Sequence, residues 1–193
     1  MEKLQDLSER NIMPPDLFNH YVERRKKAYA TGGESVYVPD AKIPGFKVFN
    51  WKNPDFPYHF EDHYTDRRQR LGNFGGFEIT REISEEGAPL TFYDYSGGLT
   101  EEGLKLQEQT EKGLSTGEPV VYSRLTKFLG DHVTDIRFGK NVKFNFEDRL
   151  GKWTYKGLGQ VEAYGWHDEE TITCNGVLLY RIKGNGICFV PTF

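Results

Sequence analysis

The sequence predicts an α+β fold in which two repeats each pack a helix on an antiparallel sheet. Three observations predict it. A helical stripe of apolar residues follows Pro14 and another follows Pro119, aromatic and β-branched runs come after each stripe, and Gly, Pro or Asn separates most of those runs. The length of 193 residues suits one domain, residues 1–193, with both repeats sharing a core.

The first half begins with a short helix expected over 1–13 and a second one that Pro14-Pro15-Asp16 opens. The apolar residues of the second helix follow helical spacing: Leu17, Phe18, Tyr21, Val22, Ala28 and Tyr29. Thr31-Gly32-Gly33 supplies its stop. Antiparallel strands are then expected over FKVFNW (46–51), YHFEDHY (58–64), GGFEITREI (75–83) and LTFYDYS (90–96).

The second half repeats this order of elements. Residues 101–118 are polar and predict a connecting helix or loop. Pro119 opens an amphipathic helix that Gly130 closes, with the apolar residues Val121, Tyr122, Leu125, Phe128 and Leu129. Strands are expected over VKFNFED (142–148), WTYKGLGQVEAY (153–164), DEETITC (168–174), VLLYRIK (177–183) and ICFV (187–190).

Matching segments support an internal repeat of residues 17–100 in residues 118–190. FGGFEIT (74–80) aligns with WHDEETI (166–172), which pairs Phe74 with Trp166 and Glu78 with Glu170. The identities are few and one gap is needed, so two independent halves of similar composition are the alternative.

Composition and charge exclude several classes of protein. Hydrophobic residues make up 37% and aromatic residues 15%, enough for a sizeable core. The net charge of −4 gives no positive field for nucleic acid or an anionic membrane, and the basic run 24–27 is expected to complement a helix dipole. Because no apolar run could span a bilayer and the first 15 residues lack a signal core, we expect a cytoplasmic protein.

The acidic run in WHDEETITCNG (166–176) is predicted to be one arm of a hairpin. Asn175-Gly176 favours a type I′ turn, which would place Glu170 opposite Arg181 and Asp168 opposite Lys183. His167 and Glu169 then point to the other face. A functional carboxylate is the alternative, and a metal site has too few ligands on either face.

Glu78 is the acid that most suggests a binding site. Across the EEGAP turn lie Thr91, Phe92 and Tyr93, none of which is basic. In a pocket, such a carboxylate would have a raised pKa and could bind a cation beside aromatic rings, whereas on an exposed face it would be unremarkable. The predicted ligand-binding residues are Glu78, Tyr93, Tyr95, Trp166 and Glu170.

Other motifs point away from a cofactor. His59 and His63 have metal-ligand spacing only on a helix, and FPYHFEDHY predicts a strand. The two GxG pieces, at 157–159 and 184–186, do not lie between a strand and a helix. There is no GxSxG, P-loop or HExxH motif, and Cys174 and Cys188 suit small core positions. No cofactor, metal or catalytic residue is therefore predicted.

Several segments together resemble a known family. One half is matched by the segments KAYATGG (27–33), YHFEDHYTD (58–66), Phe74 to Glu78 and YSGG (95–98). The other half is matched by PVVYSRLTKFL (119–129), WTYKGLGQVEAY (153–164), W-x-D-x-E-x-I (166–172) and LYRIKGNGI (179–187). Over residues 17–190 they are similar to a prokaryotic domain family of unknown function, sometimes found behind a helix-turn-helix repressor domain. Two departures from the family are expected: the absence of such a DNA-binding domain, and Asp168 standing where the first half has Gly76. The resemblance implies no activity.

We expect a non-enzymatic module that binds or senses a small molecule, with a cation as one candidate. The alternatives are an acid/base hydrolase or isomerase using Glu78 or Glu170, and a homodimeric interaction protein that pairs through a sheet edge or aromatic face. Neither nucleic acid nor membrane is an expected partner.

Overall fold

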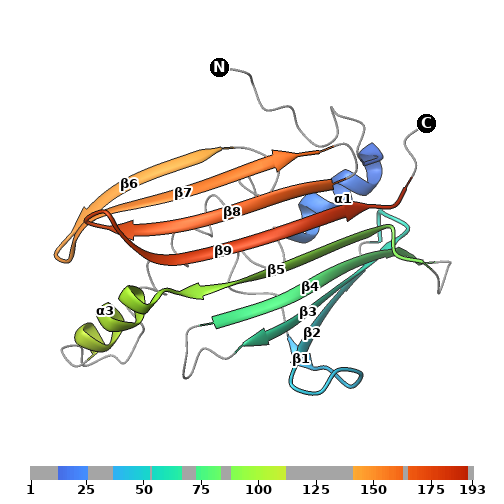
Figure 1. Ribbon diagram of the computed structural model, residues 1–193. Coiled ribbons are helices and arrows are strands. Elements are labelled where there is room, and N and C mark those ends of the chain that lie inside the picture. Colours follow the sequence, from blue (N-terminus) through green and yellow to red (C-terminus); the bar gives the residue numbers. More distant parts are fainter. Residues whose placement is uncertain are drawn as a thin grey trace.

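The computed structural model describes residues 13–25, 37–52, 54–66, 73–83, 88–111, 141–162 and 165–190 (Figure 1). Over these ranges the chain is mostly β, with one nine-strand antiparallel sheet and two short helices. The prediction of an antiparallel sheet with helices is confirmed at this level. The helix predicted over 119–130, and all but the last residue of the one predicted over 1–13, lie outside the described residues.

The strand predictions from the sequence are confirmed in outline, with two differences. A short strand, β1, precedes those expected, and the segments VLLYRIK and ICFV belong to one strand that runs through the GxG piece at 184–186. The strands are β1 (Val38–Pro39), β2 (Lys47–Lys52), β3 (Tyr58–Asp66), β4 (Asn73–Glu82), β5 (Thr91–Leu99), β6 (Val142–Asp148), β7 (Gly151–Val161), β8 (Gly165–Cys174) and β9 (Val177–Cys188).

Two meanders join to form the sheet. Its order is β1-β2-β3-β4-β5-β9-β8-β7-β6, and every neighbouring pair is antiparallel. β5 and β9 meet at the centre, where Tyr95 pairs with Gly184. Segments about 90 residues apart in the sequence therefore lie side by side in the middle of the sheet (Figure 1).

The helix α1 (Pro15–Arg25) confirms, over its described part, the predicted helix that Pro14-Pro15-Asp16 opens. Pro15 begins it because a proline in the first turn loses no helical hydrogen bond, and Asp16 complements the positive end of the helix dipole. Leu17, Phe18 and Tyr21 are buried, which follows from their spacing on one side of the helix.

The sheet curls around α1. His20 stacks on Trp51 of β2, with ring centroids 4.9 Å apart, and Tyr21 meets Trp166 of β8 edge-on at 5.5 Å. β2 and β8 are five places apart in the sheet order, about 24 Å in a flat sheet. A helix about 10 Å across touches both only if the sheet bends around it. We call the face toward α1 the concave face and the opposite one the convex face.

The β8–β9 hairpin has the predicted turn. Asn175 and Gly176 have φ values of 50° and 81°, as a type I′ turn requires, and Cys174 pairs with Val177. Beyond Thr173 the register shifts, because Leu179 is an extra residue that forms a β-bulge between the pairs Thr173–Leu178 and Ile172–Tyr180. Every pair after the bulge is displaced by one residue from the predicted register.

The bulge lies where the helix α3 (Glu101–Glu111) begins. The N–H of Thr100 donates to the carbonyl of Leu179 at 2.9 Å, and its hydroxyl donates to the carbonyl of Leu178 at 2.6 Å. The same hydroxyl accepts from the N–H of Gly103 at 3.1 Å and so caps the helix. This helix confirms the helical alternative for residues 101–111.

No two-fold repeat is evident in the described part of the chain. Five strands lie on one side of the β5–β9 junction and four on the other, and the counterpart predicted for α1 lies outside the described residues. Of the helices in the described ranges, none is long and apolar enough to cross a membrane.

Candidate functional site

The strand register brings acids and aromatic residues together on the concave face. Asp62 of β3 pairs with Glu78 of β4, and Glu78 pairs in turn with Tyr93 of β5. All three are buried. Residues directly opposite on one sheet face are nearest neighbours, so this row places two carboxyl groups and a phenol in succession.

Four of the five residues predicted to bind a ligand lie together, and the fifth lies apart. The Tyr93 ring stacks with Tyr95 at 5.9 Å and with Trp166 at 6.1 Å, and Glu78 is its cross-strand neighbour. Glu170 shares the concave face and is buried, but it lies four residues from Trp166 along β8, a distance of about 13 Å.

The side chains of two tyrosines of β5 point in opposite directions, and each packs over a glycine of a neighbouring strand. Tyr95 lies over Gly76 and its hydroxyl donates to Asp62 at 2.8 Å. Tyr93 lies over Gly184 and donates to Asp168 at 2.7 Å. A Cβ added at Gly184 would lie 2.0 Å from the Tyr93 hydroxyl, so only glycine leaves room for the ring. The glycines of the GxG piece at 184–186 thus serve ring packing.

The interpretation of Glu78 as an acid without a basic partner is wrong. Arg24 of α1 reaches into the sheet and donates from Nη2 to Glu78 Oε2 at 3.0 Å, and both side chains are fully buried. Its guanidinium lies between the rings of Tyr21 and Phe60, 3.9 and 4.0 Å from their centroids. Arg24 was expected to complement a helix dipole, and it instead forms a buried ion pair.

Trp166 has a buried hydrogen-bond donor with no acceptor among the described residues. Its ring is only 1% exposed, and its plane is tilted 7° from that of Tyr93. The indole Nε1 makes no hydrogen bond there. His20 of α1 is similar, since neither ring nitrogen has a partner in the described part of the chain. Burial, with Arg24 nearby, lowers the pKa of His20 to about 3, so it is neutral at pH 7.

The predicted pairing of the acidic run with its own hairpin is wrong in detail. Asp168 lies opposite Gly184 and Glu170 opposite Ile182, because the bulge at Leu179 shifts the register. Both acids point to the concave face, where Tyr155 donates to Glu170 at 3.1 Å. Arg181 pairs instead with Glu169 on the convex face, with Nε and Oε1 2.5 Å apart.

The sequence interpretation missed Asp62. It accepts hydrogen bonds from Tyr37 and Tyr95 on the concave face. Burial and the neighbouring Asp62 raise the pKa of Tyr37, so this phenol keeps its proton and donates it. The signal was available in YHFEDHY, where Tyr58, Phe60 and Asp62 alternate onto one face of the strand.

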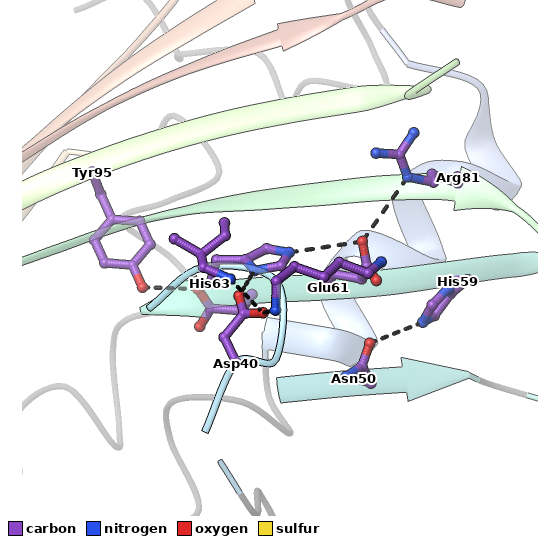
Figure 2. A network of polar contacts seen from close by, with 10 residues as sticks. Asp40, Asn50, His59, Glu61, His63, Arg81 and Tyr95 are labelled. Carbon is purple, nitrogen blue, oxygen red and sulfur yellow. Dashed lines mark hydrogen bonds and ion pairs between the residues drawn. The ribbon is translucent and has the colours of Figure 1, made fainter. Parts of the chain in front are cut away.

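A second polar network lies on the convex face of β3 (Figure 2). His63 Nδ1 lies 2.6 Å from Asp40 Oδ2, and its Nε2 lies 3.7 Å from Glu61. The His63 ring stacks on Phe77 with centroids 4.6 Å apart. This network fastens the loop after β1 to the sheet, because Asp40 also accepts from the N–H groups of Lys42 and Ile43.

No metal-binding group of three or more His, Cys, Asp or Glu occurs in the part of the chain that the structure describes. His59 and His63 lie on one strand, as predicted, and His59 contacts Asn50 instead of sharing a partner with His63. Cys174 and Cys188 are free and buried, and burial raises the pKa of both thiols. These positions match the predicted core role for the cysteines.

Comparison with known proteins found no similarity: no family model, curated protein or solved structure matches this chain. The resemblance to a family found behind helix-turn-helix domains therefore stays a prediction. Function has to be inferred from the residues of this chain themselves.

Proposed function

We propose that this protein is a small-molecule binding or sensing module whose ligand lies on the concave face against Tyr93, Tyr95 and Trp166. A planar molecule with a hydrogen-bond acceptor suits these three buried rings best. The observation that carries the proposal is the indole N–H of Trp166, which is buried and has no acceptor among the described residues.

The energetics of Trp166 support a binding role. A buried donor without an acceptor costs about 1–3 kcal/mol, which a ligand acceptor would recover. Tyr93 and Trp166 are nearly parallel, and the hydrogen bond from Tyr93 to Asp168 fixes the Tyr93 ring. Small-molecule sites typically combine such apolar and aromatic walls with a few fixed polar groups.

The pairing of Glu78 with Arg24 changes the expected ligand. A cation was the first candidate while Glu78 had no known basic partner, and the 3.0 Å ion pair removes that argument. The N–H donor of Trp166 favours a ligand that carries an acceptor instead, such as a carbonyl, a carboxylate or a ring nitrogen.

Thermal-shift and calorimetric titrations test the proposal. The probes are 4-hydroxybenzoate, nicotinamide and uracil, with tetramethylammonium as a cation that has no acceptor. Trp166→Phe keeps an aromatic ring and removes the N–H, and Trp51→Phe is the matched control on β2. We expect at least one planar probe to raise the Tm, with about tenfold weaker binding in Trp166→Phe and unchanged binding in Trp51→Phe.

Two outcomes count against the proposal. If no planar probe shifts the Tm, or if Trp166→Phe binds as tightly as the natural chain, the indole N–H is not a recognition group. Binding of tetramethylammonium alone would favour the cationic ligand instead.

A further inference from the structure

A polar trench crosses the convex face over β7, β8 and β9, on the side of the sheet opposite the proposed site. Its volume is about 580 Å³. Two rows of side chains form its walls: Gln160, His167 and Asn185 in one row, and Leu158, Glu169 and Lys183 in the other. The strand register generates both rows, since the residues of each are direct cross-strand partners.

The dimensions of the trench follow from sheet geometry. Each row spans two strand spacings, about 10 Å, and the rows lie two residues apart along each strand, about 7 Å. The backbone of Gly159, Asp168 and Gly184 lies between the walls. A volume of this size lies in the usual range for small-molecule sites, about 300–1,000 Å³.

Hydrogen bonds fix the orientation of one wall. His167 Nδ1 lies 2.8 Å from Asn185 Oδ1, and His167 Nε2 lies 3.1 Å from Glu162 Oε1. The hydrogen bond to Asn185, together with Glu162, raises the pKa of His167, and in the protonated ring both nitrogens donate, Nδ1 to Asn185 and Nε2 to Glu162. The carboxamide nitrogen of Asn185 then faces Asp94, with both oxygens 3.5 Å away.

The charges around the trench balance one another. Glu169 pairs with Arg181 and Glu162 pairs with His167. Lys183 makes no ion pair with any residue in the described ranges, and Asp94, opposite Asn185, adds one negative charge to the same face. The trench thus offers donors and acceptors without a dominant sign, so it does not select for a strongly charged ligand.

We infer that this trench binds a neutral, hydroxyl-rich ligand of the carbohydrate class, a mono- or disaccharide. A hydroxyl both donates and accepts, which matches the carboxamides of Gln160 and Asn185. Lys183 adds a donor, and Leu158, 39% exposed, provides an apolar contact for the C–H face of a sugar. This site lies on the other face of the sheet from the one under Proposed function and does not depend on it.

NMR titration of the ¹⁵N-labelled full chain tests the inference. The probes are glucose, galactose, mannose, N-acetylglucosamine, maltose and cellobiose, with glucose 6-phosphate as an anionic comparison. We expect at least one neutral sugar to shift the backbone amides of residues 158–160, 167–169 and 183–185. Gln160→Ala and Asn185→Ala should each weaken that binding about tenfold, as expected for the loss of one well-oriented hydrogen bond.

Asn145→Ala is the matched control, because Asn145 is exposed on the edge strand β6 outside the trench. It should leave the sugar titration unchanged, and so should Trp166→Phe, which separates this site from the concave one. Gln160 is exposed, so its variant tests binding even if Asn185→Ala disturbs the sheet. The inference is overturned if no neutral sugar shifts these amides or if Gln160→Ala and Asn185→Ala bind normally. It is also overturned if only glucose 6-phosphate binds and Lys183→Gln abolishes that binding.

Discussion

Two arginine–glutamate pairs show how the two faces of one sheet use the same chemistry differently. Arg24 and Glu78 lie 3.0 Å apart on the concave face with side chains 0% exposed. Arg181 and Glu169 lie 2.5 Å apart on the convex face with side chains 47% and 30% exposed. The shorter pair is the less consequential one, because water solvates its charges whether or not they meet.

The buried pair has a different energetic role. Its two charges have left water at a cost of several kcal/mol each, and their mutual contact offsets that cost. Either residue left without the other would be a buried charge that has lost its principal compensation. The solvent exposure of the two charges, and not the distance between their atoms, therefore decides how much stability is lost when an ion pair is broken.

The largest expected effect comes from breaking the buried pair. Arg24→Met leaves the Glu78 carboxylate buried without the guanidinium and should lower the free energy of unfolding by about 3–5 kcal/mol. The double variant Arg24→Met/Glu78→Gln removes both charges and should recover part of that loss. Urea denaturation measures both free energies. A loss below about 1 kcal/mol in the single variant would mean that the buried ion pair contributes no more than an exposed one.

The next largest loss of stability is expected from overpacking the concave face. Gly184→Ala places a methyl group 2.0 Å from the Tyr93 hydroxyl and should cost about 1–3 kcal/mol through overpacking. Gly75→Ala is the convex control, where the atom nearest to the added Cβ is the carbonyl oxygen of Tyr95, at 3.2 Å, and Ser96 lies at 3.7 Å. Equal losses for the two variants in urea denaturation would show that the faces do not differ in packing.

The buried His20 should make stability depend on pH. Its pKa is about 3 in the folded chain and about 6.5 when unfolded, so below pH 6.5 the unfolded state binds the proton first. Stability is therefore lost as the pH falls from 6.5 toward 3, by about 2 kcal/mol between pH 7 and pH 5.

His20→Phe keeps a ring against Trp51 and should lose this part of the pH dependence. Denaturation at pH 7 and pH 5 gives the difference for both chains. The prediction is wrong if the variant loses as much stability between these pH values as the natural chain does.

The smallest effect is expected at the exposed pair. Arg181→Met should change the free energy of unfolding by no more than about 1 kcal/mol, and salt should shrink the change further. Denaturation at low and high ionic strength measures it. A loss as large as that of Arg24→Met would mean that exposure does not separate the two pairs.

Much of the local structure could be predicted from the sequence. The spacing of Leu17, Phe18 and Tyr21 predicted α1, alternation predicted the strands, and Asn175-Gly176 predicted the turn that joins β8 and β9. These predictions held because each depends on residues close together in the chain, where backbone preferences and periodicity act directly.

The candidate site could be predicted only in part. Glu78, Tyr93, Tyr95 and Trp166 were chosen from one sequence, and they share a face because each lies at an inward position of its strand. Arg24 was not identified as the partner of Glu78, since the two are 54 residues apart and meet only when the sheet closes over α1. The acids Asp168 and Glu170 were given the wrong partners because a single bulge at Leu179 carries no clear sequence signal.

The sequence by itself determined the helix, the strands and their alternation, since these arise from steric and hydrophobic preferences over a few residues. The tertiary structure decided which side of each strand is buried and which distant residues meet there. A sheet face becomes an interior only when the sheet bends around something, and here α1 lies between β2 and β8. That curvature assigns Glu170 to the interior and Glu169, its neighbour in the chain, to the solvent.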